Sequence, residues 1–583
     1  DAFHEIERAK KLGSATSPAA GGGAAAGGIK KHFLEALPEW HDDLVRLIVN
    51  NYLALSFVEY PEFRVVVQRL NKKAKVPDRK GLLSRMRAVK RGLETEVALM
   101  LDEEFVAITT DGWTSRRNES YMSLTVAYIN SEWELQHLSL DCAKHTGTTT
   151  GEDLAKLIAG MIESHDLTGR VTACVTDCEP SMVKAGRLLE VGGGTISHVG
   201  CANHRMESTT SSVFNGRSLR AVSLARTLVG RYKKSSQMAA RLAALCGILE
   251  IVALCVMQEV ETRWWSTWAM IARLLYLEKA IKMHESLDGV PPLLSDEDWE
   301  VLQLVEPILE PFMRTQKDLE GAKYVTGSMT IPNIAQLRDG VKDAINNLRN
   351  ASRQGLTTTR QKAMESVLPD AEGLLEDLTN RWGDGTNVMK YMEGRRRQPQ
   401  GFKLVQVFAT GLDPRCKHLY GIQPSEHPAV WRAVADAAVD IAMEKHASNN
   451  TPASAESSNS EPDQSPPVSP PPQGDPKRPR MSAFENNTAA AHAEDAQASG
   501  VAGSKPTKTA SGVMATTTVF PNPLDWWRKR QLEYPLLAAL ARRVLAIPSS
   551  QAQSERMFST AGLTVTPNRS CLADSNVELL VYL

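Results

Sequence analysis

Two aspartates follow predicted β-strands, and acids in that position are the residues of this sequence best suited to chemistry. Asp111 follows the apolar run of residues 106–110, and Asp177 follows a second run at residues 171–176. If these strands are neighbours in one sheet, the two carboxylates meet at the ends of the strands. Carboxylate oxygens are hard ligands that suit a cation such as Mg²⁺.

Each acid also has an ordinary structural explanation. Asp111 could be a turn residue before Gly112, and Asp177 could cap the helix that begins near Pro180. Glu555, a third acid, lies in the first turns of a predicted helix, where the helix dipole favours negative charge. The spacing of these acids alone does not decide between a functional site and these structural roles.

The elements around the aspartates have the order β-β-β-α-β-α. The first three strands predict an antiparallel meander, with a turn at residues 130–132. This order is the one that the ribonuclease H-like fold uses, with an acid on its first strand and another at the end of its fourth. The predicted elements are strands at 106–115, 121–129 and 133–142, a helix at 151–165, a strand at 171–177, a helix from 180, a strand at 198–202 and a helix after His204.

The fold class predicted for the whole chain is α/β plus α, a mixed sheet core interrupted by a large all-helical insertion. The C-terminal part predicts two helices, the second over residues 551–561 and ended by Gly562. The segments that we expect are a flexible leader at 1–34, a helical and potentially DNA-contacting region at 35–104, the first part of the core at 105–217, the helical insertion at 218–448, a disordered Pro/Ser-rich linker at 449–518, and a C-terminal region at 519–583 that completes the core.

Composition excludes several classes of protein. The chain has 583 residues with a formal net charge of -1, so it is not a uniformly basic nucleic-acid coat. Any DNA binding must come from local patches such as the basic clusters at residues 72–75 and 85–91, which could equally be solvated helix faces. Eight cysteines without a CxxC pair favour a reducing compartment. Residues 242–257 are the most apolar stretch, but Glu250 interrupts them, so we expect a buried helix and no membrane span.

Six motifs in order resemble those of the hAT superfamily of DNA transposases and their domesticated relatives. The last of them looks like the hAT carboxy-terminal dimerisation region. The motifs are Thr110-Asp111-Gly112-Trp113-Thr114-Ser115, Thr176-Asp177 with Met182-Val183-Lys184-Ala185, Cys201-Ala202-Asn203-His204, Thr262-Arg263-Trp264, Leu412-Asp413-Pro414-Arg415, and Ser554-Glu555-Arg556-Met557-Phe558-Ser559-Thr560-Ala561-Gly562.

The resemblance implies a function for the three acids. Asp111, Asp177 and Glu555 would be the catalytic DDE triad and the ligands of two divalent ions, Mg²⁺ or Mn²⁺. One ion would activate water or a 3'-hydroxyl and the other would stabilise the leaving oxygen. The chain would cleave transposon ends and join them to target DNA, acting as a homodimer or higher oligomer in the nucleus. The alternative is a domesticated, non-catalytic nuclear protein that binds DNA and dimerises.

The same resemblance implies residues that contact DNA. His204 would contact DNA or the scissile phosphate, with Cys201 as a structural residue near the active site. Arg263 and Trp264 would bind DNA, with Trp264 stacking on a flipped base. Trp265 stands where relatives more often have Asn, which favours the domesticated alternative.

Two other kinds of site have candidates in the sequence. Cys174, Cys178, Cys201 and His204 are candidate zinc ligands, but their spacing is atypical and zinc is not expected. Many relatives begin with a BED-type zinc finger, and no Cys-x-x-Cys with His partners precedes residue 111. We expect either a finger in a further N-terminal segment or DNA binding by other surfaces. The basic residues Lys477, Arg478 and Arg480 are a candidate nuclear-import signal.

Overall fold

The computed structural model describes residues 40–102, 104–115, 118–193, 196–214, 216–259, 264–351, 357–386, 388, 401–449, 522–564 and 573–583. The chain divides into two compact units, of which the first comprises Asp1–Met443 and Asn522–Leu583 and contains the sheet. The second unit, Glu444–Pro521, falls almost wholly outside the described residues. The predicted leader and nearly all of the predicted linker, with Lys477, Arg478 and Arg480, also lie outside them.

The described chain begins with helices that lead into the sheet. They are α3 (Trp40–Asn50), η1 (Leu55–Glu59), α4 (Pro61–Leu70) and α5 (Arg79–Met100). The start of α5 is fixed by Asp78, whose side chain accepts a hydrogen bond from the backbone N–H of Gly81. Leu82 and Met86 of α5 are buried in one apolar cluster with residues of α3 and of the C-terminal helix α21 (Asp574–Tyr582). The N-terminal helices are thus tied to the end of the chain.

The sheet is six-stranded and mixed, with the order β2-β3-β1-β5-β6 and with β4 paired to β3. β1 pairs antiparallel with β3 and parallel with β5, and β5 pairs parallel with β6. The predicted meander is therefore confirmed. The strands are β1 (Val106–Thr109), β2 (Gly112–Thr114), β3 (Ser120–Ile129), β4 (Leu135–His145), β5 (Val171–Thr176) and β6 (Ser197–Gly200).

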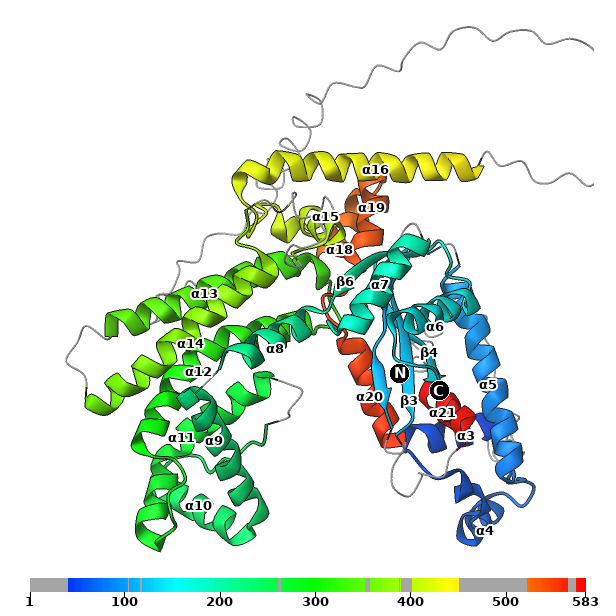
Figure 1. Cartoon of the computed structure of the whole chain (residues 1–583). Helices are drawn as coiled ribbons and strands as arrows, with labels where there is room; N and C mark the ends of the chain where they lie inside the picture. The colour runs from blue at the N-terminus through cyan, green and yellow to red at the C-terminus, as the bar shows by residue number, and fades with distance from the viewer. Residues whose placement is uncertain are drawn as a thin grey trace, which may run out of the picture. The chain divides into compact units, whose positions relative to one another are not determined.

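The two faces of the sheet pack against different parts of the chain. On one face, Val106 and Ile108 share an apolar cluster with residues of α6 (Gly151–Ser164) and α7 (Pro180–Gly193). On the other face, Ala107 lies in a cluster with residues from α15 (Leu404–Leu412), α16 (His427–Asn449) and α19 (Pro535–Leu545). This division follows from the two-residue periodicity of a strand. In Figure 1, α6 and α7 lie beside the cyan strands of the sheet.

A long run of helices separates β6 from the C-terminal block. Most of these helices share the largest apolar cluster of the protein, which includes Trp299 and Trp382. They are α8 (Ala202–Val213), α9 (Gly216–Lys234), α10 (Ser236–Ile248), α11 (Trp264–Asp288), α12 (Asp296–Leu319), η2 (Gly327–Met329), α13 (Thr330–Ala351), α14 (Thr358–Trp382), α15 (Leu404–Leu412), η4 (Pro414–Cys416), η5 (Pro424–Glu426) and α16 (His427–Asn449).

The C-terminal block returns to the sheet. It consists of α18 (Pro523–Arg530), α19 (Pro535–Leu545), α20 (Ala552–Thr564) and α21. Met557 and Phe558 of α20 are buried against Tyr121 of β3, and Phe558 stacks on Trp113 of β2 with ring centroids 6.0 Å apart. Figure 1 shows α20 beside the strands although the whole helical run separates them along the chain.

Three sequence expectations need correction. The strand expected at 106–115 is divided into β1 and β2, because beyond Thr109 only β3 continues alongside it. The helix expected over 242–257 ends at Ile248, and the described residues that follow it are not helical. The helix α20 continues past Gly562 to Thr564. None of the helices in the described ranges is long and apolar enough to cross a membrane.

Candidate active site

Asp111 and Asp177 lie at adjacent strand ends. β1 and β5 are parallel neighbours, with Thr109 opposite Val175, and the N–H of Thr110 donates to the carbonyl oxygen of Val175 at 3.2 Å. Each aspartate follows its strand by one or two residues. The carboxyl ends of parallel strands meet at one edge, so both side chains start from the same edge of the sheet. The prediction that the strands before Asp111 and Asp177 are neighbours in one sheet is therefore confirmed.

Backbone donors orient the two carboxylates. The N–H of Gly112 donates to Oδ1 of Asp111 at 2.9 Å, and the N–H of Glu179 donates to Oδ1 of Asp177 at 3.1 Å. The backbone of Asp111 is held in turn by β3, through bonds with Ser123. A carboxylate whose position is fixed by its own turn is already arranged to bind a charged ligand.

The N-terminal part of α20 is hydrogen-bonded to the end of β1. The hydroxyls of Ser554 and Thr109 lie 2.8 Å apart, and the side-chain amide of Gln551 donates to the carbonyl oxygen of Thr110. Both contacts are buried. Glu555 follows Ser554 directly, so these contacts bring the third predicted carboxylate to the strand end that carries Asp111.

The charges of this region are coupled. Burial raises the pKa of Asp111 to about 6, His204 opposes this rise, and the negative charges of Asp177 and Glu555 add to it. The pKa of Asp177 is also raised, chiefly by burial and against the effect of His204. Burial together with nearby like charges raises the pKa of Asp111, and such a combination is common in functional sites.

His204 is the basic residue of this cluster. It lies on α8, and its pKa is raised first by the sulfur of Cys201 and then by the carboxylates of Asp111 and Glu555, although burial lowers it. Cys201 is fully buried, and its sulfur accepts a hydrogen bond from the N–H of Gln551 at 3.4 Å. Cys201 thus joins the start of α8 to the turn before α20.

Glu207 is a member of the cluster that the sequence analysis missed. It lies one helical turn after His204 on α8, and burial raises its pKa, as does Glu555, while His204 lowers it. The only sequence signal was its spacing of three residues from His204, which puts both side chains on one helix face. That spacing has meaning only once α8 is known to face α20.

The fit of a divalent metal ion can be judged from the chemistry of the donors. Asp111, Asp177 and Glu555 offer hard oxygen ligands, and the raised pKa of Asp111 shows buried negative charge that a cation would stabilise. The chemistry of these oxygen donors therefore suits Mg²⁺ or Mn²⁺, whereas their placement among the described residues does not form a three-ligand site. Within the described residues, no three His, Cys, Asp or Glu side chains are placed to hold one metal ion, and this includes the four candidate zinc ligands.

Two predicted DNA-binding residues are not brought to the cluster by any described contact. Arg263 lies outside the described residues, and Trp264 begins α11 with only its backbone described. The neighbouring Trp265 is half-buried, and the ammonium of Lys317 lies 5.6 Å from its ring centroid.

Two family models match the chain. Residues 511–583 match the hAT family C-terminal dimerisation region, and residues 109–191 match the ZBED1 RNase-like domain. The first match covers the block that carries Glu555, and the second covers both strand-end aspartates. The two halves of the proposed acidic cluster therefore fall within separate matched regions.

The chain is also similar to several curated proteins. A Talaromyces stipitatus protein described as a transcriptional regulator is 22% identical over 49% of this chain and 38% of its own length. A Zea mays protein described as an AC transposase is 22% identical over 81% of this chain and 55% of its own length. The zinc finger BED domain-containing protein RICESLEEPER 2 of Oryza sativa subsp. japonica is 22% identical over 92% of this chain and 73% of its own length.

The chain thus spans about two fifths and just over half of the first two relatives. The chain is therefore similar to the hAT family of transposases and hAT-derived proteins, through its C-terminal dimerisation region and through relatives described as an AC transposase and a BED-finger protein.

Proposed function

We propose that the chain is a DDE-type DNA transposase that cleaves transposon ends and joins them to target DNA by transesterification. The observation that carries this proposal is that Asp111 and Asp177 follow neighbouring parallel strands, while buried hydrogen bonds attach the start of the helix that carries Glu555 to the end of β1. The rise that Asp177 and Glu555 cause in the pKa of Asp111 supports one shared acidic site. The relative described as a transposase supports the reaction class.

In this proposal the three carboxylates hold divalent ions, Mg²⁺ or Mn²⁺. When bound, such ions lower the pKa of an attacking water or hydroxyl and stabilise charge on the leaving oxygen. The residues of the chain orient the DNA: His204, whose raised pKa favours the charged imidazolium, would bind the scissile phosphate. Glu207 is a further acid near His204 and Glu555, and its pKa is raised chiefly by burial.

We further propose that the sheet is a ribonuclease H-like core interrupted by a helical insertion. The sheet order, with the acids at the ends of neighbouring strands β1 and β5, supports the core. The long helical run from α9 to α16, between β6 and the C-terminal block, supports the insertion.

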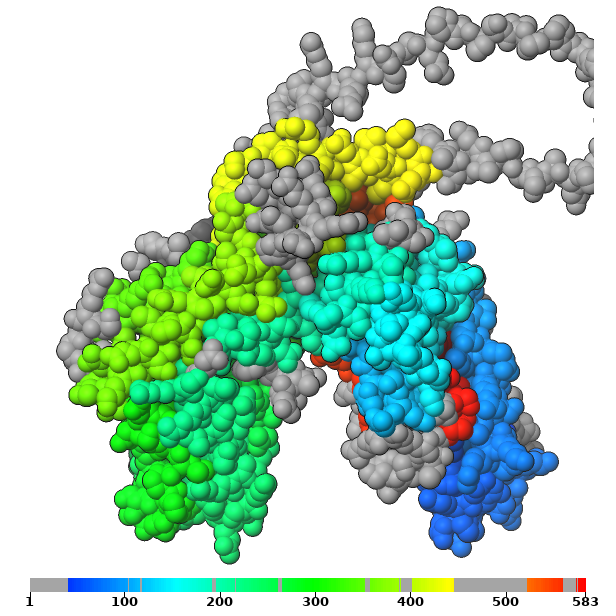
Figure 2. Space-filling model, in the orientation of Figure 1, coloured from blue at the N-terminus to red at the C-terminus, as the bar shows by residue number. Residues whose placement is uncertain are grey.

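DNA binding is proposed to use local basic surfaces. Lys80, Arg87 and Arg91 are exposed and lie at spacings of seven and four residues, so they form one stripe along α5. Among the described residues, none of the three forms an ion pair, whereas Arg79 and Arg85 are paired with acids. Figure 2 shows the blue N-terminal helices at the surface. Arg263 and Trp264 remain proposed contacts to the DNA near the cleavage site.

Dimerisation and nuclear localisation complete the proposal. The matched dimerisation region supports a homodimer or higher homo-oligomer. Import into the nucleus would use Lys477, Arg478 and Arg480, which stand together in the sequence.

The test is a strand-cleavage assay on DNA that carries the terminal repeats of the element, with Mg²⁺. Cleavage by the wild type and its loss in Asp177→Asn, with unchanged DNA affinity, support the enzyme. Cleavage that persists in the variant at the wild-type rate contradicts the assignment of Asp177.

A second function is favoured by one specific observation. The relative from Talaromyces stipitatus is described as a transcriptional regulator. A non-catalytic hAT-derived protein of this class would use the same fold to bind DNA and to dimerise, and it would not need to cleave DNA. Sequence-specific DNA binding without cleavage, by both wild type and Asp177→Asn, would establish this alternative.

A further inference from the structure

A largely buried ion pair, in which the side chain of Arg415 is 16% exposed and that of Asp413 is not exposed, lies between α15 and η4, far along the chain from the three acids. Asp413 is completely buried, and Nη2 of Arg415 lies 2.7 Å from its Oδ2. A buried ion pair contributes little net stability, because removing both charges from water costs about as much as their attraction returns. We therefore expect the main effect of this ion pair to be on the positions of the chain segments that it binds.

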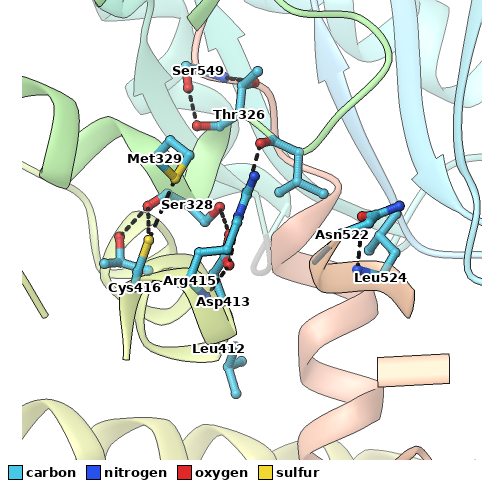
Figure 3. A network of polar contacts seen from close by, with 12 residues as sticks. Thr326, Ser328, Met329, Leu412, Asp413, Arg415, Cys416, Asn522, Leu524 and Ser549 are labelled. Atoms are coloured by element: carbon cyan, nitrogen blue, oxygen red, sulfur yellow. Dashed lines mark hydrogen bonds and ion pairs between the residues drawn. The ribbon is translucent and has the colours of Figure 1, made fainter. Parts of the chain in front are cut away.

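Both members of the pair bind one short segment ahead of α13. The hydroxyl of Ser328 donates to Oδ2 of Asp413 at 2.6 Å, and Nη2 of Arg415 donates to the carbonyl oxygen of Val325 at 3.2 Å. The segment is also bonded to α15, because Thr410 donates to the carbonyl oxygen of Ser328. Figure 3 shows Asp413 and Arg415 directed at this segment.

The same segment holds the turn that precedes α20. The N–H of Ser549 donates to Oγ1 of Thr326 at 3.1 Å, and the hydroxyl of Ser549 donates to the carbonyl oxygen of Thr326 at 2.6 Å. The backbones touch beside these bonds, because a Cβ added to Gly327 would lie 2.1 Å from the carbonyl oxygen of Ile547. Both bonds are buried, as the upper part of Figure 3 illustrates.

From Ser549 the contacts continue to the acids. The carbonyl oxygen of Ser549 accepts the N–H of Ala202 at 2.9 Å, beside Cys201 and two residues before His204. Ser554 then bonds Thr109 at the end of β1. A continuous set of buried polar contacts therefore links the ion pair to the helix that carries Glu555.

We propose that Asp413, Arg415 and Ser328 are positioning residues that hold Glu555 against the strand ends that carry Asp111 and Asp177. This inference rests on the proposed function for its catalytic consequence. The alternative is a local staple within the helical region, with no effect on α20.

The test compares Ser328→Ala and Arg415→Lys with the control Arg360→Lys. Lysine keeps the charge but loses the planar fork that bonds Asp413 and Val325 together. The control has the same substitution in an ion pair elsewhere in the helical region, between Arg360 and Glu300 at 2.6 Å. Ser328→Ala is the milder variant and leaves the ion pair itself in place.

The first readout is amide hydrogen exchange at residues 552–558, which needs neither DNA nor metal. Both variants should speed exchange there by about tenfold or more, with exchange in α6 unchanged, because α20 loses its anchor. The control should leave α20 at the wild-type rate. Unchanged exchange in α20 for both variants overturns the proposal, whether or not the chain cleaves DNA.

The second readout is rescue by a tether. The hydroxyls of Thr109 and Ser554 are 2.8 Å apart, so Thr109→Cys with Ser554→Cys should form a disulfide that holds α20 without the network. In Arg415→Lys, oxidation of this cysteine pair should restore slow exchange in α20. If the chain cleaves DNA, Arg415→Lys should lower the cleavage rate by about a hundredfold, and oxidation of the cysteine pair should raise that rate again. Failure of the oxidised tether to restore slow exchange contradicts the proposal, while restored exchange without any cleavage rejects only the proposed function.

Discussion

At the scale of single residues, the clearest feature is the raised pKa of Asp111. Burial, Asp177 and Glu555 all favour its protonated form, and its pKa is raised to about 6. A bound divalent cation would reverse this preference, because it stabilises the ionised carboxylate. The perturbed pKa is therefore an argument for a cation site as well as for an acidic cluster.

This argument predicts that Mn²⁺ binding depends on Asp111. In Asp111→Asn, the Kd for Mn²⁺, measured by the loss of the free-ion EPR signal, should rise by more than about tenfold. Asp440→Asn is the matched control, since Asp440 is an exposed acid on α16. Equal Mn²⁺ affinity in wild type, variant and control would show that Asp111 is no ligand.

The residues of the cluster differ in how far the sequence revealed them. Asp111 and Asp177 could be predicted because an acid directly after an apolar strand has a place fixed by local structure. The importance of Glu555 came from its family motif, because no local pattern says where a helix packs. Glu207 was missed for the same reason, since its role depends on which way α8 faces.

At the scale of elements, β6 is fixed by a buried histidine. Nε2 of His198 lies 2.8 Å from the hydroxyl of Thr176 on β5, and its ring is packed so tightly that a Cβ on Gly186 would meet it at 2.2 Å. Burial lowers the pKa of His198 to about 4 from an ordinary value of 6.5. The folded chain thus favours the neutral ring.

The sign of the resulting pH dependence follows directly. A histidine with a lowered pKa stabilises the fold fully above about pH 6.5, and this contribution is lost as the pH falls towards about 4. The free energy of unfolding of wild type, relative to His198→Asn, should fall by about 2 kcal/mol between about pH 7 and about pH 5. Urea unfolding of both proteins measures this difference, in which the other acids cancel. A constant difference across the range would contradict a buried neutral His198.

The basic stripe on α5 predicts an electrostatic contact with DNA. Replacing Lys80, Arg87 and Arg91 together with Gln should weaken DNA binding alike for all sequences. The slope of log K against log salt should become shallower by about 0.9 for each DNA phosphate that the variant no longer neutralises. Fluorescence anisotropy at several salt concentrations measures both effects.

A control for this experiment is available on other helices. Lys233, Lys234 and Lys362 are exposed, and their replacement by Gln changes the net charge by the same amount. If the control weakens binding as much as the α5 variant, the effect comes from net charge and α5 is no specific contact surface.

The elements themselves were predicted well where periodicity was clear. The strands and the helices α6 and α7 follow their apolar patterns, so their boundaries agree within a few residues. The division of the strand at Asp111 could not be predicted, because it depends on β5 ending there. The early end of α10 at Ile248 could not be predicted either, since an apolar run does not reveal where its chain turns.

At the scale of the whole molecule, the C-terminal block is part of the sheet domain. Residues of α19 share an apolar cluster with Ala107 and Val175 of the sheet, and α20 packs on β3. The indole N–H of Trp527 on α18 donates to the carbonyl oxygen of Leu412 at 2.8 Å. The family motif for dimerisation thus also completes the fold of its own chain.

This packing predicts that the block stays bound after the chain is cut. A cleavage site for a specific protease can be inserted near residue 485. After cleavage, the two fragments should elute together from a size-exclusion column at neutral pH without denaturant. They should separate only in denaturant, because the shared core is large and apolar. Fragments that separate without denaturant would contradict the intramolecular packing of α18–α20.

No sequence pattern could have shown that the C-terminal block packs back on the sheet. The return of Glu555 depends on the fit of Ser549 to Thr326, which lies 223 positions earlier in the chain, and on the ion pair that holds the segment of Thr326. The sequence indicated that Leu412–Arg415 belongs to a family pattern but not what it contacts. Long-range placement was the part that only the structure could supply.

The central claim is that Asp111, Asp177 and Glu555 form one metal-dependent site for DNA cleavage. Its most direct test is metal rescue of Asp177→Cys. Replacing the carboxylate by a thiolate should weaken the binding of Mg²⁺ more than the binding of Mn²⁺, because Mn²⁺ accepts sulfur ligands more readily. The account predicts that this variant cleaves terminal-repeat DNA at less than about a hundredth of the wild-type rate with Mg²⁺ and recovers at least about tenfold with Mn²⁺, while Asp177→Asn recovers with neither. Wild-type cleavage rates for both variants with Mg²⁺, or no cleavage by wild type with either ion, would contradict it.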